Sequence, residues 1–292
     1  MKQTHLIALL FAASLMACSS DDESAGTKEE KRLIYVDVSE NPLTDPSAAA
    51  KERMTTRIAN PTTTATLASF SMNYLQSFQY NFKKTGNSWS TNSWPTSAEY
   101  DDKIDFYAYT GGSFQYNNGD PYVNFTIDED AFKQHDLLVA EHKQIAWNDA
   151  DGHVSLLFDH ACTALTFKVV LTNTLRNNLG HDLTVTSIVL KNVRNTGSYY
   201  YNNKNHWANV NGSANYTLTN SDITVTTTAQ ELPCGYLFMI PQTRDTDGTN
   251  GTYLEINYTT SDQPAYIPMD INWETGVIEP IEIRLGTSTI QE

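Results

Sequence analysis

The sequence predicts an all-β fold made of two tandem antiparallel β-sandwich domains. Short stretches in which apolar and polar residues alternate recur along the chain, and Gly, Asn and Asp turn signals separate them. Thr, Asn, Ser and Tyr are abundant, whereas long helix-forming runs are scarce. A chain of 292 residues is long enough for two modest domains. Many short strands at this spacing favour sandwiches over alternating strands and helices.

Residues 1–17 have the features of a lipoprotein signal peptide. Lys2 supplies a positive charge, and residues 6–16 are apolar except for Ser14. This apolar run is too short to span a bilayer and is followed by a small residue and then Cys18. We therefore expect cleavage before Cys18 and attachment of diacylglycerol to its sulfur. The alternative is an ordinary secretory signal with a chance cysteine.

Residues 18–32 are expected to form a flexible acidic tether, because they are polar and show no periodicity. The run Ser19-Ser20-Asp21-Asp22-Glu23 resembles the surface-export signal of Bacteroidota-type lipoproteins. The formal net charge of the chain is -15. Such an acidic surface repels phosphate backbones, so nucleic acid is excluded as an expected partner. No later segment is long and apolar enough to be a membrane helix.

Residues 33–150 are expected to form the N-terminal sandwich. In the segment 104–109, the even-numbered and the odd-numbered residues should face opposite sides of a strand. Residues 48–54 are expected to form a short helical turn. The strands predicted in this domain are 33–38, 67–75, 104–109, 122–127 and 136–146.

Residues 151–292 are expected to form the C-terminal sandwich, with a boundary that can lie twenty or more residues further along. The strongest strand signal is 154–171, where the apolar positions are even-numbered up to residue 160 and odd-numbered from residue 165. A strand cannot change parity without an irregularity, so we predict a bulge or bend within 161–164. The other strands predicted here are 183–193, 223–227, 236–240, 253–258 and 281–285.

Several segments share their order and spacing with one known family. They are Thr56-Arg57 before a Thr-rich lead to Phe70, Trp94-Pro95 before residues 104–109, residues 136–140, residues 154–161 and, more weakly, Trp273-Glu274-Thr275-Gly276. Behind the lipoprotein signal of residues 1–18, this set resembles the fimbrillin family, the type V pilins of Bacteroidia. The resemblance implies two transthyretin-like β-sandwich domains. It also implies a structural role in adhesion, with no catalysis and no cofactor.

The resemblance further implies a route of assembly. The precursor reaches the cell outer membrane as a lipoprotein, and an arginine-specific protease removes the lipidated piece together with the first strand. The vacated groove accepts a strand from the next subunit, so other fimbrial subunits are the expected partners and the fimbrium is the final location. A host or bacterial surface receptor or glycan is a further expected partner.

Carried onto this sequence, the resemblance assigns residues to these steps. Arg57 is the first choice for the cut, Arg53 the second and Arg32 the third. From the residues alone, Arg57 would instead be a solvated charge in a loop. The removable strand comprises Leu33, Ile34, Tyr35, Val36, Asp37 and Val38.

The C-terminal segment holds a candidate donor strand with apolar residues Ile281, Ile283 and Leu285. Val277 and Ile278 stand where shaft subunits of the family usually carry tyrosines. The last strand can therefore be needed within its own domain. In that case the chain would be a tip or accessory subunit, or a surface lipoprotein outside any filament.

An aromatic cluster motivates an alternative function. Tyr199, Tyr200 and Tyr201 precede a run of amides that leads to Trp207, and aromatic faces beside amides can stack on sugars. On this interpretation the chain is a non-polymerising surface lipoprotein that binds glycans. Alternating aromatic residues at strand ends around a turn are the structural explanation of the same pattern.

No metal or catalytic site is expected. Histidines recur at steps of seven residues, which place partners on opposite faces of a strand: His135 with His142, and His153 with His160. His160 is expected to be a satisfied core or edge histidine. Residues 245–250 resemble a calcium loop but lack its twelfth-position glutamate, and a hairpin loop is preferred. Cys162 and Cys234 can form a disulfide or remain buried thiols.

Overall fold

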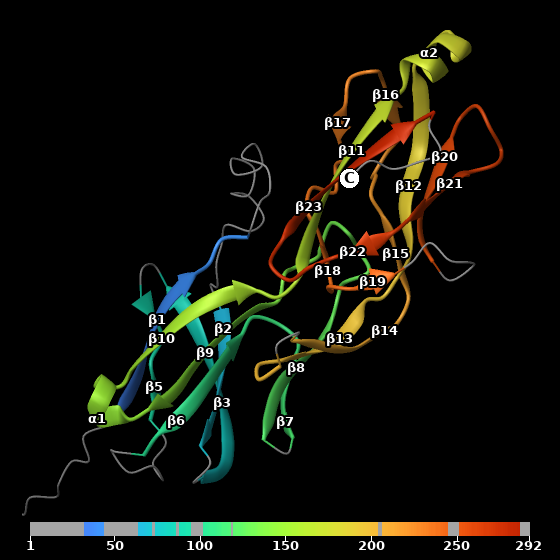
Figure 1. Cartoon of the computed structure of the whole chain (residues 1–292). Helices are drawn as coiled ribbons and strands as arrows, with labels where there is room; N and C mark the ends of the chain where they lie inside the picture. The colour runs from blue at the N-terminus through green and yellow to red at the C-terminus, as the bar shows by residue number, and fades with distance from the viewer. Residues whose placement is uncertain are drawn as a thin grey trace, which may run out of the picture. The chain divides into compact units, whose positions relative to one another are not determined.

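The structure is a computed structural model of the whole chain, and β-strands dominate it (Figure 1). It describes residues 32–43, 64–71, 74–85, 88–94, 102–117, 119–203, 206–244 and 251–286. Within these ranges there are two short helices, α1 (Trp147–Ala150) and α2 (Asn173–Leu179). No helix in the described part of the chain has the length and apolarity needed to cross a membrane. The all-β class predicted from the sequence is confirmed.

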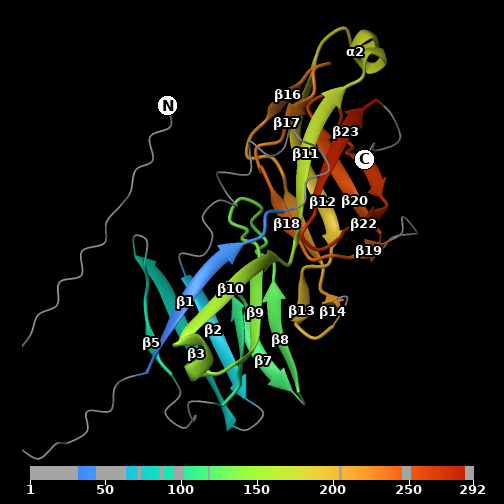
Figure 2. The ribbon, with the colours of Figure 1, turned by 60° about the vertical axis from the view of Figure 1, so that its left-hand side comes forward.

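The first sheet has eight strands in the order β4-β3-β2-β6-β9-β10-β1-β5. Figure 2 shows its strands β1 and β10 side by side. Its end strands β4 and β5 are separated in the sequence only by Ser90 and Thr91, so the sheet must curl until its two ends meet. The curled sheet encloses a hydrophobic core that includes Trp94, Phe106 and Phe158. The strands are β1 (Leu33–Glu40), β2 (Thr64–Ser71), β3 (Tyr74–Thr85), β4 (Ser88–Trp89), β5 (Asn92–Ser93), β6 (Ile104–Tyr109), β9 (Leu138–Ile145) and β10 (His153–His160).

Strand β6 contributes to two hydrophobic cores. Its even-numbered residues, including Ile104 and Phe106, lie in the core of the first sheet. Tyr107 and Tyr109 point to the other side and join a second, larger core. The predicted opposition of the two sets is therefore confirmed, and both faces of this strand are buried.

The other strands surround the larger core. Four of them form a sheet in the order β14-β13-β8-β7, which joins segments from both halves of the chain. Another sheet has the order β15-β12-β20-β21, and β16 also pairs with β12. In a further sheet, β11 pairs with β17, β18 and β23. The last two strands, β19 and β22, pair with each other. Residues 32–292 form one compact unit, so the division into two domains stays a prediction. The strands are β7 (Ser113–Asn117), β8 (Asp120–Thr126), β11 (Thr163–Leu171), β12 (Leu183–Val193), β13 (Thr196–Tyr200), β14 (Trp207–Asn211), β15 (Ala214–Thr217), β16 (Ile223–Val225), β17 (Gln230–Glu231), β18 (Leu237–Met239), β19 (Thr243–Arg244), β20 (Thr252–Tyr258), β21 (Ala265–Met269), β22 (Ile271–Asn272) and β23 (Ile278–Leu285).

The chain passes from the first sheet to the larger core at Ala161 and Cys162. Strand β10 ends at His160 and β11 begins at Thr163. Even-numbered residues are buried along β10, and odd-numbered residues such as Leu165 are buried along β11. The irregularity predicted within 161–164 is confirmed, because the break between the strands allows the change of parity.

In the described part of the chain, two strand pairs are parallel, which departs from the antiparallel arrangement predicted. Strand β1 lies parallel to β10, and β23 lies parallel to β11. Parallel neighbours need a long connection between them, and more than a hundred residues separate the members of each pair. Alternation of apolar residues carries no information about strand direction, so the sequence pattern could not reveal this.

The single strand predicted over 67–75 is wrong, because β2 and β3 pair there as two antiparallel strands. Helix α2 was also missed, although its end signals are present in the sequence. The Thr172 hydroxyl accepts a hydrogen bond from the Leu175 amide at the N-terminus, and Gly180 ends the helix with a positive φ of 76°. The predicted turn at 48–54 lies outside the described residues.

Candidate functional site

Strand β1 is inserted in the first sheet, between β10 and the short β5. Its parallel register with β10 runs from Tyr35 opposite His153 to Glu40 opposite Phe158. The Tyr35 amide donates to the Gly152 carbonyl at 2.9 Å, and the Asn41 amide donates to the Phe158 carbonyl at 2.8 Å. The N-terminal segment therefore supplies a complete strand to a sheet whose other strands come from residues 64–160.

The inward side chains of β1 fill part of the first core. Ile34 is 0% exposed and Val36 is buried, and both belong to the same cluster as Trp94 and Phe106. Val38 packs against this cluster while half-buried. Without β1, these apolar positions would be empty and the edge of β10 would be open.

Gly152 allows β1 to start close to the turn before β10. Its φ is +76°, and a Cβ at this position would lie 2.2 Å from the Leu33 carbonyl oxygen. Any other residue would therefore clash with the backbone of β1. The positive φ adds strain for a side chain in the same place.

The outward face of β1 contacts β10 through one exposed group of side chains. The Tyr35 ring stacks on the His153 ring with centroids 5.1 Å apart. His153 Nδ1 lies 2.9 Å from Asp37 Oδ2. Both members of this ion pair are more than half exposed, so water screens it and its contribution to stability is small.

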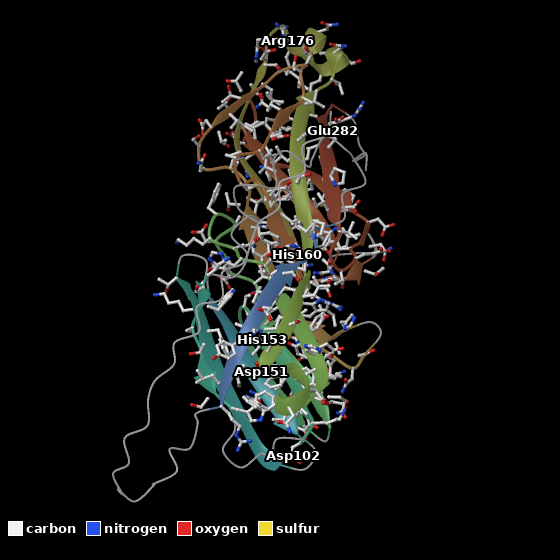
Figure 3. All side chains as sticks on the ribbon, turned by 90° about the vertical axis from the view of Figure 1, so that its left-hand side faces the viewer. Asp102, Asp151, His153, His160, Arg176 and Glu282 are labelled. Atoms are coloured by element: carbon white, nitrogen blue, oxygen red, sulfur yellow. The ribbon has the colours of Figure 1, made fainter. Side chains whose placement is uncertain are left out.

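A buried charge cluster holds the C-terminal end of β1. The His160 side chain is 2% exposed; its Nδ1 lies 2.5 Å from Asp136 Oδ2, and its Nε2 lies 3.2 Å from Glu40 Oε1. The second Asp136 oxygen accepts a hydrogen bond from the Cys162 amide at 3.1 Å. Figure 3 shows His160 beside the end of β1 and His153 further down the same sheet. His160 is thus a core histidine, as expected, but it is also a contact between β1 and the rest of the molecule.

The carboxylates determine the charge of His160. Burial lowers the pKa of the imidazole, but the hydrogen bond to Asp136 and the proximity of Glu40 outweigh burial and raise the pKa to about 9. Burial raises the pKa of the Asp136 carboxyl, and its hydrogen bonds with His160 and the Cys162 amide offset part of that increase. His160 is therefore protonated at neutral pH while Glu40 is in place.

A polar pocket of about 440 Å³ opens beside this cluster. Asn41 and Pro42, which follow β1, form part of its wall together with Asp159 and His160. Opposite them are residues from the second half of the chain, Tyr199, His206, Thr275 and Gly276. The end of β1 therefore lies where the two halves of the chain meet.

The aromatic residues predicted to bind glycans are mostly in the core. Tyr199, Tyr201 and Trp207 are all buried, whereas Tyr200 is half-buried and stacks on Tyr122. The Tyr201 hydroxyl donates to the Ala108 carbonyl at 2.8 Å, and Trp207 Nε1 donates to the Ala161 carbonyl at 2.7 Å. Three of the four rings are thus occupied by packing within the protein.

The candidate donor strand lies within its own sheet. Ile281, Ile283 and Leu285 are buried in the larger core, on the strand β23 that pairs with β11 over its whole length. Ile278 at the start of β23 is buried in the same core. Releasing this strand would open that core.

The lipidation site, the cleavage sites and the two remaining cysteines were also predicted from the sequence. Cys18, Arg53 and Arg57 lie outside the described residues. Cys162 and Cys234 are both buried free thiols, so they are not paired. Among the residues that the structure describes, no group of three His, Cys, Asp or Glu side chains could hold a metal ion.

The charge cluster of Glu40, Asp136 and His160 was not predicted from the sequence. Glu40, Asp136 and His160 come from three separate segments, and only the fold brings them together. The available signal was the buried parity of His160 within an apolar run, because a histidine in such a position needs a polar partner.

Comparison with known proteins shows where this architecture occurs. A fimbrial protein from Bacteroides vulgatus ATCC 8482 has a similar structure, with a TM-score of 0.56 and 20% identity over 89% of this chain and 97% of that chain. A candidate cell adhesion protein from Bacteroides ovatus ATCC 8483 matches with a TM-score of 0.52 and 16% identity over 89% and 95%. A candidate cell adhesion protein from Bacteroides eggerthii DSM 20697 matches with a TM-score of 0.50 and 14% identity over 88% and 86%.

These identities are low, so the solved structures show a shared fold alone. No curated protein shows a significant match to the sequence. The family model described as fimbrillin-like, however, matches residues 50–292, which is most of the chain. The chain therefore belongs to the fimbrillin-like family.

Proposed function

We propose that this chain is a fimbrial subunit, exported as a lipoprotein through Cys18 and assembled on the cell surface by strand exchange for adhesion. Family membership and the fimbrial and adhesion descriptions of its structural neighbours support the adhesive role. The observation that carries the mechanism is the position of β1. It completes the first sheet and its core, yet it enters from the N-terminal end of the chain.

The mechanism follows from what β1 covers. Arg53 and Arg57 both lie in the sequence between β1 and β2, so a cut after either would leave β1 attached only by non-covalent contacts. Its departure would expose the edge of β10 and the positions of Ile34 and Val36. A strand from a neighbouring subunit would restore the backbone ladder and refill the core. Repeated head to tail, such contacts build an open filament.

We further propose that this chain accepts a strand and does not donate β23, which fits a tip or accessory position. The support is the burial of Ile281, Ile283 and Leu285 within their own core. The glycan-binding alternative gains no support, because three of the four aromatic rings that motivated it are buried. No enzymatic role is proposed.

Digestion of the folded full-length precursor with an arginine-specific protease tests this proposal. We expect a cut at Arg57 or Arg53, followed by oligomers in light scattering when a partner subunit is added. The matched control replaces both arginines by lysine, which keeps the charge and should prevent cutting and assembly. Resistance of both bonds in the folded precursor, or cutting without any gain of binding, would refute maturation by cleavage.

A further inference from the structure

Two histidine–carboxylate pairs connect β1 to β10, and they differ in their exposure. At the N-terminal end, Asp37 pairs with His153 in water. At the C-terminal end, Glu40 pairs with His160, whose side chain is 2% exposed. The exposed pair contributes little, whereas the buried pair affects whether a strand can occupy this position at all.

We propose that His160 sets the chemistry of the strand that replaces β1: the incoming strand must place a carboxylate where Glu40 lies, two residues beyond its third apolar position. This inference rests on the proposed strand exchange and names the kind of partner that it requires. The partner is a different subunit with an extended segment of the form apolar-x-apolar-x-apolar-x-acidic, corresponding to Ile34, Val36, Val38 and Glu40.

The requirement arises because, without β1, only one of the two ring nitrogens of His160 has a carboxylate partner. Asp136 belongs to the segment before β9 and stays on Nδ1 when β1 leaves, but Nε2 loses the Glu40 carboxylate, an ion-pair contact at 3.2 Å that lacks hydrogen-bond geometry. A new strand that covers Nε2 without a carboxylate would bury the imidazolium charge with one negative partner fewer. Such burial is among the costly defects of a protein interior.

Among the residues that the structure describes, the groups near His160 do not replace Glu40. Asp159 is adjacent to His160 on β10, but it is exposed on the opposite face of the strand and accepts a hydrogen bond from the Asn41 side chain at 2.6 Å. The Cys162 thiol is buried, and burial together with Asp136 raises its pKa well above the usual value, so it carries no charge. The remaining titratable groups at the pocket are Tyr199 and His206, whose rings stack on each other at 4.8 Å.

The C-terminal strand of a second copy does not meet the requirement. Aligning Ile281, Ile283 and Leu285 with the three apolar positions of β1 places Thr287 at the position of Glu40. Threonine carries no charge and is too short to reach as far as glutamate. The groove therefore discriminates against a second copy of this chain and favours a partner with the acidic residue.

Peptide exchange into the full-length chain tests the proposal. A foreign protease site placed between β1 and β2 allows the chain to be cut regardless of whether Arg53 or Arg57 is a natural site. Labelled peptides covering residues 32–42 then compete with the resident β1, and mass spectrometry measures the occupancy at pH 7. We expect the E40Q peptide to bind roughly ten- to a hundredfold more weakly than the natural one, because it loses a buried charged contact. The D37N peptide is the matched control and should bind within about twofold.

The second arm uses the peptide of residues 279–289, which should bind poorly, and its T287E variant, which should gain about tenfold or more. In a chain carrying His160→Gln, the preference for Glu40 over glutamine should shrink to less than about twofold. Equal binding of the natural and E40Q peptides to the unmodified chain would overturn the role of His160 alone. Failure of the natural peptide to enter the cut chain would overturn strand exchange itself, and this inference with it.

Discussion

Replacing Ile34 by alanine measures how strongly β1 is held in the first sheet. Ile34 has no exposed surface and lies in the core with Trp94 and Phe106. Truncating a buried isoleucine to alanine costs about 2–5 kcal/mol of unfolding free energy, because it removes apolar contact and leaves a cavity. The matched control is the next residue, Tyr35, which points outward and is 39% exposed. Tyr35→Ala should cost less than about 1 kcal/mol, although it removes more atoms.

Urea denaturation of the full-length variants measures these differences, and hydrogen exchange locates them. If the free energy of detaching β1 from the sheet falls by about 2 kcal/mol, the protected amides of Tyr35 and Asn41 should exchange roughly thirtyfold faster. Amides of β12, in the larger core, should exchange at an unchanged rate. Equal destabilisation by Ile34→Ala and Tyr35→Ala, or unchanged exchange in β1, would show that the inward face of this strand does not hold it in place.

Three further predictions use the same chain. Glu40→Gln should lower the unfolding free energy by about 2 kcal/mol at pH 7. The pKa of His160 is raised from 6.5 to about 9, so the stabilisation by the Glu40–His160 pair is complete below pH 6.5 and is lost as the pH rises through 9. A difference in unfolding free energy between the natural chain and Glu40→Gln that stays constant to pH 10 in urea melts would contradict this. Trp207→Phe should cost about 1–3 kcal/mol in the same melts, since the buried Ala161 carbonyl loses its donor, and should leave glycan-array signals unchanged. Loss of glycan binding without loss of stability would instead restore the glycan-binding hypothesis. Cys18→Ser should abolish labelling with a palmitate analogue in cells, and persistent labelling would exclude this residue as the lipid site.

Local alternation predicted many strands because a strand that buries one face repeats that pattern in its own sequence. Strand β6 and the change of parity at Ala161 and Cys162 are examples. Alternation alone predicted one strand where the structure has two, β2 and β3. Only Met72-Asn73 separates them, and this pair contains a single turn-favouring residue.

Features that depend on distant segments could not be predicted in this way. To predict that β1 and β23 lie parallel to their neighbours, one must know which strand each of them pairs with. The periodicity within a strand does not identify its neighbour. The charge cluster could not be predicted for the same reason: the sequence indicated a satisfied core or edge histidine at position 160, but not that Glu40 and Asp136 would be its partners. Burial of Tyr199 and Trp207 depends on the sheet formed by β8 and β13, which joins segments from both halves.

The apolar burial of the two parallel strands β1 and β23 bears on which end of the chain would take part in the proposed exchange. Strand β1 joins β10 and β23 joins β11, and these host strands follow each other directly in the sequence. Strand β1 contributes two buried apolar side chains, whereas β23 contributes four, namely Ile278, Ile281, Ile283 and Leu285. At about 1.5–3 kcal/mol for each buried side chain, releasing β23 costs roughly twice as much apolar burial as releasing β1. The connection after β1 carries Arg53 and Arg57, whereas residues 273–277, which join β22 to β23, hold no arginine. The smaller apolar burial of β1 therefore favours β1 over β23 as the strand that leaves in the proposed exchange, with β23 keeping the larger core closed.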